Sequence, residues 1–294
     1  MTPLTIEVES VEGDLWPLAG PGAGGRGVTI DKDKVQGLWH PPTVTRWRSG
    51  ATQIGATYAG KSYEPRDIQF RVLMAPERVP GMSLDRLETE FDACFDEEVP
   101  ARLIVRYGGS KRWLWVTKFK EPVLEYNGNS AAAVYTLRAA FPFYESDPHL
   151  DVMVSTVEAL AGSVAAANIT DLPVYPRWVL TGGGQWTLPD HSWITDPEHE
   201  DYEFADRTIT LPAIDSDEEL VVDTFPDVET VTSNKNPMFY ARMNWRGEPV
   251  FPVPRWTPRD GQPVALPISC TEPGGIAQLR LPRYWKKPIG GDRL

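Results

Sequence analysis

Proline and glycine recur along the whole chain, and they limit how far any helix or strand can run. There are 28 prolines and 24 glycines among 294 residues. Proline lacks the backbone donor that a helix interior needs, and both residue types favour turns. This frequency of turn-forming residues excludes a helix bundle and predicts many short strands. The fold class that we expect is therefore mainly β.

The length of the chain favours two domains, because a typical domain holds roughly 150 residues. One large β domain is the other reading. We place the boundary near residue 148, after the aromatic segment 140–144. Residues 1–148 are then an N-terminal β domain, sandwich-like or barrel-like with one helix, and residues 149–294 are a C-terminal β domain.

The first domain is expected to contain short strands and a single helix at 83–96. Ser83 is a suitable helix N-cap, and apolar residues recur from Leu84 to Phe95 at three- and four-residue spacing. Two hairpins follow, with turns at 108–111 and 127–129. The expected strands are 5–8, 28–31, 43–47, 67–74, 103–107, 113–117, 122–126 and 133–138.

In the second domain every candidate element is a strand. Seven short strands separated by turn signals predict a β-sandwich or jelly roll. Three glycines at 182–184 follow one strand and precede another, which predicts a hairpin turn and leaves no helix N-terminus for a phosphate. The expected strands are 151–157, 177–181, 208–211, 219–223, 238–243, 264–269 and 276–281.

Several functional classes are disfavoured by composition. The longest apolar run, 159–167, falls short of the roughly 18–20 residues of a membrane span. Residues 1–9 have no basic segment followed by an apolar one, so we expect no secretory signal. A net charge of −12 argues against nucleic-acid binding. Cys94 and Cys270 have no metal-ligand spacing and are expected to be buried thiols.

Charge is unevenly distributed in the second domain. Residues 190–229 contain 14 acidic residues and one basic residue, whereas residues 230–294 contain 10 basic and 4 acidic residues. The simpler reading is a set of solvated loops. The alternative is charge complementarity between neighbouring subunits, which would help fix their register in an assembly.

No catalytic or cofactor motif stands out, and we expect neither an enzyme nor a cofactor. His191 and His199 lie among carboxylates, but their spacing matches no metal motif, and a solvated acidic loop is the favoured reading. A weak calcium site remains open, because calcium accepts irregular sets of oxygen ligands. The carboxylates around the histidines are Asp190, Asp196, Glu198, Glu200 and Asp201.

Eleven tryptophans raise the possibility of sugar binding, because aromatic faces stack on sugar rings. The stretch 245–248 is similar to the Trp-Gly-x-Glu stretch of galectins but has an inserted arginine, and the partner His-x-Asn-x-Arg motif is missing. Packing in a core is the stronger reading, since a buried Trp contributes a large apolar area. The tryptophans in strand-like contexts are Trp47, Trp113, Trp115, Trp178 and Trp186.

Several segments, in order along nearly the whole chain, resemble the distal tail proteins, or minor tail proteins, of long-tailed siphophages, especially those of actinobacterial hosts. In the first half these are 63–70, with its Pro65-Arg66 pair, the helix with its hairpins, and the closing 140–144. In the second half they are 168–176, 219–224 and the basic-aromatic strand 279–285.

The resemblance implies a structural virion protein at the distal end of a long non-contractile tail. It implies a hexameric ring made by the N-terminal domains, with galectin-like C-terminal sandwiches projecting outward. The partners would be further copies of the chain, the tail tube protein and the tail-tip hub or fibre proteins. We hypothesise that edge strands and loops within 1–80 of one copy pack against the next. The competing class is a carbohydrate-binding module that contacts the host surface through its second domain.

Overall fold

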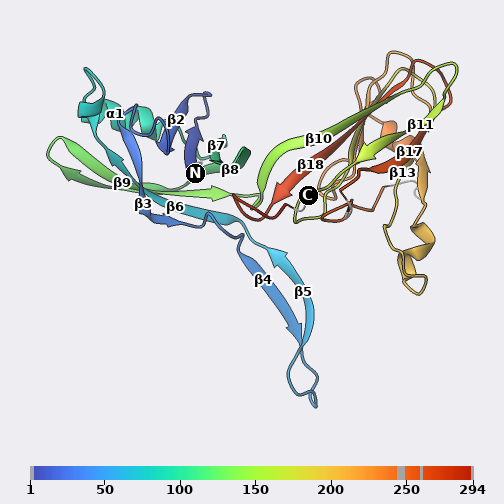
Figure 1. Cartoon of the computed structure of the whole chain (residues 1–294), viewed down its shortest axis with the longest axis horizontal. Helices are drawn as coiled ribbons and strands as arrows, with labels where there is room; N and C mark the ends of the chain where they lie inside the picture. The colour runs from blue at the N-terminus through green and yellow to red at the C-terminus, as the bar shows by residue number, and fades with distance from the viewer. Residues whose placement is uncertain (1–2, 244–248, 259–260, 293–294) are drawn as a thin grey trace. The chain divides into compact units, whose positions relative to one another are not determined.

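The computed structural model describes residues 3–243, 249–258 and 261–292. The chain divides into two compact units: unit 1 comprises Met1–Ser146 with Trp285–Gly291, and unit 2 comprises Asp147–Tyr284 with Asp292–Leu294. Strands dominate both units (Figure 1), and the described residues contain one α-helix. The expected mainly β fold class is confirmed.

Unit 1 is built around one long strand, β8, which pairs with β7 along its first part and with β9 along its second. The order β8-β7-β1-β2 continues on one side, and β8-β9-β6-β3 on the other. The bounds are β1 Thr5–Glu9, β2 Leu15–Ala19, β3 Val28–Gln36, β4 Thr43–Arg48, β5 Thr57–Tyr63, β6 Arg66–Met74, η1 Pro76–Arg78, α1 Leu84–Asp92, β7 Ala101–Tyr107, β8 Ser110–Asn127 and β9 Ser130–Ala139.

The core of unit 1 follows from its sequence pattern. The alternating residues Ile68, Phe70, Val72 and Met74 of β6 are all buried, as a half-covered strand requires. The helix α1 places Leu87 and Phe91 against the same core. It ends at Asp92 instead of the expected residue 96, because the chain tightens into turns after it. Cys94 and Phe95 are nevertheless buried.

Unit 2 is a β-sandwich with its core between two sheets. One sheet has the order β16-β15-β12-β18-β10 and the other β11-β17-β13-β14. Trp178 in one sheet and Trp186 in the other both belong to the core between the sheets and are almost fully buried. The bounds are β10 Tyr144–Val154, β11 Ala161–Ala166, β12 Arg177–Thr181, β13 Trp186–Pro189, η2 Glu200–Phe204, β14 Thr208–Thr210, β15 Leu220–Asp223, β16 Val231–Ser233, η3 Phe239–Arg242, β17 Val264–Cys270 and β18 Ile276–Trp285.

Some sequence expectations for unit 2 were wrong. The glycines 182–184 do not turn a hairpin: they carry the chain from β12 in one sheet to β13 in the other. The expected strand 238–243 contains the 3-10 helix η3, which buries Phe239. The strands β11 and β16 were missed, since one is rich in alanine and the other is three residues long.

The crossing at Gly182 predicts that two glycines of similar backbone conformation differ sharply in how much stability is lost when each is replaced by alanine. Gly182 and Gly274 have φ near +89° and +88°, but a Cβ at Gly182 would lie 2.5 Å from the Gly274 carbonyl oxygen, whereas a Cβ at Gly274 would meet nothing within 4 Å. Gly182→Ala should therefore destabilise unit 2 by about 3 kcal/mol, and Gly274→Ala by about 1 kcal/mol. Urea unfolding followed by Trp fluorescence measures both, and equal losses would contradict this account.

The segment Trp285–Gly291 belongs to unit 1, although it follows the last strand of unit 2. The expected second domain, 149–294, therefore differs from the compact unit that the structure contains. Two buried arginines hold the segment: Arg66 donates to the carbonyl oxygen of Lys286 at 2.8 Å, and Arg112 donates to those of Lys287 and Gly290. Backbone carbonyls thus solvate two buried cations.

Candidate assembly surfaces

The strands β4 and β5 form a two-stranded sheet of their own, which projects from unit 1 (Figure 1). We call residues 43–63 the arm. All six residues of β4 are exposed, and so are residues 49–56 at the tip. A lone hairpin is at best marginally stable in water. This geometry is typical of a segment that another chain covers.

The arm carries large apolar side chains that face water. Trp47 is 59% exposed, and its ring lies 5.6 Å from that of Tyr58 in an edge-on contact. Ile54 at the tip is fully exposed, and Val44 on β4 is about half exposed. Exposed apolar groups gathered in one place mark interaction sites rather than ordinary surface. The expectation that Trp47 packs in a core was therefore wrong.

Charge on the arm has one sign. Arg46, Arg48 and Lys61 lie on it, and residues 43–63 contain no Asp or Glu. Because charge on an edge also discourages indiscriminate strand pairing, these cations favour a specific acidic partner surface.

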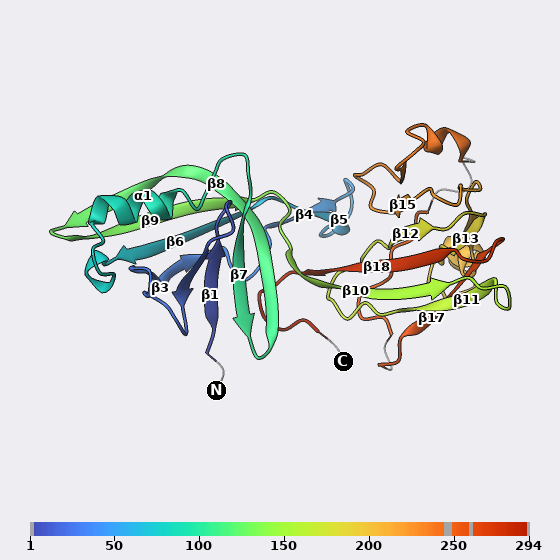
Figure 2. The ribbon, with the colours of Figure 1, turned by 90° about the horizontal axis from the view of Figure 1, so that it is seen from above.

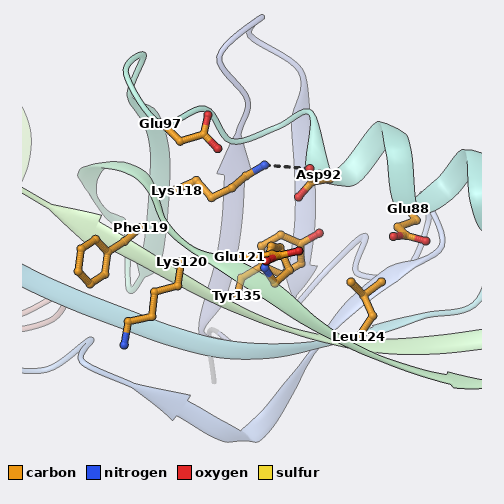
Figure 3. A pocket seen from close by; sticks show the side chains of 10 residues that line it. Glu88, Asp92, Glu97, Lys118, Phe119, Lys120, Glu121, Leu124 and Tyr135 are labelled. Carbon is orange, nitrogen blue, oxygen red and sulfur yellow. Dashed lines mark hydrogen bonds and ion pairs between the residues drawn. The ribbon is translucent and has the colours of Figure 1, made fainter.

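A surface pocket of about 390 Å³ lies between α1 and β8 (Figure 3). Lys118 bridges it by donating to Asp92 at 2.8 Å, and Tyr135 lies beneath. Burial raises the pKa of the Tyr135 hydroxyl well above its usual range. The pocket is of mixed charge, since its lining includes Glu88, Glu97 and Glu121 as well as Lys118 and Lys120. It offers charged contacts to a partner but no paired nucleophile and base.

The histidines and carboxylates of the acidic stretch are not brought together as a site. Asp190 is buried, pairs with Arg207 at 3.0 Å, and accepts from the backbone N–H groups of Val250 and Phe251. Burial raises the pKa of Asp190 and lowers that of His191. Asp190 therefore ties two loops together, whereas His199, Asp196, Glu198 and Glu200 lie on an exposed loop.

Within the described ranges, no group of three or more His, Cys, Asp or Glu residues could hold a metal ion. No described helix is long and apolar enough to cross a membrane. Cys94 and Cys270 are free and buried as expected, and burial raises the pKa of the Cys94 thiol to about 12.

The tryptophans divide between core and surface. Trp178 and Trp186 are core residues, as expected, whereas Trp115 is 41% exposed and donates to Glu145 at 3.1 Å. Trp113, on the same strand face, is largely buried. The galectin-like stretch 245–248 lies outside the described residues.

Three polar residues within the segments that resemble the tail-protein family are buried and hydrogen-bond to backbone carbonyl groups of other segments. Arg66 is 0% exposed and donates to the carbonyl oxygens of Leu38 and Lys286. Asn168 donates to three backbone carbonyls, and Thr224 donates to that of Pro176 at 2.8 Å. Buried polar groups need such partners, so these positions hold loops in place.

Comparison with known proteins yields two relatives that align with this chain over nearly their whole length. Minor tail protein Gp27 of Mycobacterium phage D29 is 24% identical over 343 aligned residues, and that of Mycobacterium phage L5 is 23% identical over 342. Each alignment covers 99% of this chain and 99% of the relative. No family model matches the chain.

Among solved structures, the Dit protein (gp 19.1) of phage SPP1 has a similar fold. The TM-score is 0.57 at 9% identity, and the match covers 94% of this chain and 98% of that protein. Its structure is described as a paradigm of the hub adsorption apparatus in phages that infect Gram-positive bacteria. The relatives and the fold together confirm the resemblance to minor and distal tail proteins of phages.

Proposed function

We propose that this chain is a structural protein of the tail of a long-tailed phage and has no catalytic role. Similarity to two minor tail proteins over nearly the whole chain supports a place in the virion tail. The shared fold with a protein of a hub adsorption apparatus supports a place in the hub or baseplate region. The distal end of the tail, between the tube and the hub or fibre proteins, is the position that we propose.

Within that role, further copies of the chain form a closed ring, six in number by analogy with the family that the sequence resembles. The observation that carries this proposal is the arm, a hairpin without a sheet partner that exposes Trp47, Tyr58 and Ile54. A contact between two different surfaces of the same protein closes into a ring when its rotation permits. Unit 1 would then make the ring, as its arm reaches the next copy.

The surface that receives the arm is on unit 1 of the neighbouring copy. The pocket in Figure 3 is lined by more carboxylates than cations, among them Glu88, Glu97 and Glu121, and so has the charge that the arm cations require. Buried apolar contacts at Trp47 and Ile54 would supply most of the binding free energy. The charged groups would mainly set orientation and association rate.

The test is the mass of the purified chain across a concentration series, with negative-stain imaging of the same sample. Six copies of a 32.9 kDa chain give about 200 kDa, and the images should show rings. Antibodies against the chain should label virion tails at the end away from the head. Labelling of heads, or of no part of the virion, would contradict the tail role, whereas a monomer that labels the tail would contradict self-assembly alone.

A further inference from the structure

One face of the sandwich in unit 2 is more apolar than a solvent-facing sheet should be. The outer side chains of β10 are Leu150, Val152 and Val154, which are 52%, 47% and 51% exposed. They alternate with His149 and Asp151, whose side chains contact the backbone of Ala165 on β11 and thereby fix which way β10 faces. An antiparallel sheet in contact with water normally has polar residues on this side.

The neighbouring strands extend this apolar face. In the sheet, β10 lies beside β18, and β18 beside β12 (Figure 2). Ile276 on β18 is 43% exposed, and Val179 on β12 lies opposite Val221 on β15. We call these outward residues of β10, β18, β12 and β15 the outer face. Its apolar side chains span four adjacent strands and so form a continuous patch, unlike the isolated apolar residues of an ordinary surface.

Two arginines lie opposite each other on the outer face. Arg280 and Arg177 are directly paired in the register of β18 and β12, an arrangement that like charges disfavour. Asp223 lies 3.7 Å from Arg177. Arg280 donates to Gln278, and no carboxylate of the described residues lies within ion-pair distance of it. The outer face therefore has an excess positive charge beside an apolar strip.

The chain itself contains a surface of the complementary kind. Residues 195–206, which we call the acidic loop, join β13 to β14 in the other sheet and contain six carboxylates and no Lys or Arg. The loop includes η2, and Tyr202 within it is 43% exposed. Figure 1 shows this yellow segment projecting from the sandwich. A projecting aromatic residue among carboxylates complements an apolar strip that has an excess of positive charge beside it.

We propose that the acidic loop of one copy binds the outer face of unit 2 of a second copy. The contact is heterologous, since the two surfaces lie on different sheets of the sandwich, and it can therefore repeat from copy to copy. It rests on the proposed assembly of this chain with itself and adds a contact between unit 2 domains to that made by the arm. Arg280 and Arg177 would pair with loop carboxylates, and Tyr202 would pack on Val152.

Disulfide trapping between differently tagged full-length chains tests this contact. One chain carries Val152→Cys and the other Tyr202→Cys; the two native cysteines are buried and should not compete. Under mild oxidation the mixed pair should give a cross-linked dimer. Adding Arg177→Glu and Arg280→Glu to the first chain should lower the yield of the cross-linked dimer about ten-fold, because the charges orient the contact. Charge reversal of Glu198, Glu200 and Glu203 to Lys in the second chain should then restore the yield.

Val99→Cys is the matched control, because Val99 is 52% exposed and belongs to unit 1, whereas both proposed surfaces belong to unit 2. It should give no cross-link with Tyr202→Cys. Rings that form without a Val152→Cys to Tyr202→Cys disulfide would overturn this contact and leave the proposed function standing. Cross-links formed by a chain that makes no rings would support the contact and count against the ring. Absence of both would overturn both.

Discussion

Replacing Trp47 and Ile54 together with Ser is expected to abolish self-assembly while leaving the fold of unit 1 intact. Both side chains face water in the single chain, so their loss removes little internal packing. In an interface, a buried aromatic or large aliphatic anchor contributes about 2 kcal/mol. The two losses together correspond to roughly a 10³-fold weaker association. Sedimentation velocity measured at several concentrations gives the change.

Leu15→Ser is the control for these substitutions, since it removes an exposed apolar side chain that lies neither on the arm nor in the lining of the pocket in Figure 3. It should leave the association constant within about three-fold of the parent. Thermal unfolding of all variants checks that the fold persists. If the Trp47 and Ile54 variant assembles as tightly as the parent, the arm is not the ring contact. If it assembles normally only in the presence of tail tube protein, the arm still fails as the contact between copies.

Arg66→Ala is expected to destabilise unit 1 by about 4 kcal/mol, because it opens a cavity in the core and removes hydrogen bonds from a buried cation. One of the bonds lost is that to the backbone oxygen of Lys286, which holds the segment 285–291. The guanidinium also lies 5.0 Å from the ring centre of Tyr144. Burial lowers the pKa of Arg66, because the charged guanidinium is disfavoured away from water. Urea unfolding of unit 1 measures the loss.

Arg71→Ala is the matched control on the same strand. Arg71 lies at the surface and pairs with Asp31 and Glu125, so its loss should cost no more than about 1 kcal/mol. A second readout is specific to the tether. In Arg66→Ala, trypsin should cleave between Lys286 and Lys287 well before it cleaves the parent there. Unchanged cleavage together with unchanged stability would mean that Arg66 does not hold the segment.

Most of the local structure could be predicted from periodicity. The alternation in β6 and the glycine turn between β7 and β8 are local signals, and both elements form where expected. The partner of a strand is not a local property. Residues 43–47 were correctly expected to be a strand, but nothing in their pattern says that β4 pairs only with β5 and leaves Trp47 in water. The crossing at 182–184 was misread for the same reason.

The candidate surfaces were harder to predict than the fold, because a surface is defined by the side chains that remain exposed after folding, and the sequence does not show which those are. The acidic stretch was visible as a run of charge, yet only the structure separates buried Asp190 from the exposed loop that follows it. Arg66 was noticed within a family-like segment, and its role as an internal tether depends on a carbonyl 220 residues away. The sequence does contain one signal for the arm, since residues 43–63 include aromatic and basic residues and no acidic residue.

The tether at Arg66 also has a consequence for synthesis. Residues 285–291 complete unit 1, yet they are translated after every strand of unit 2. The strands of unit 2 are therefore synthesised before unit 1 can be completed. Until residues 285–291 are made, Arg66 and Arg112 lack the carbonyl oxygens of Lys286, Lys287 and Gly290 that they bond in the folded chain. Folding of unit 1 therefore cannot be completed before the strands of unit 2 have been translated.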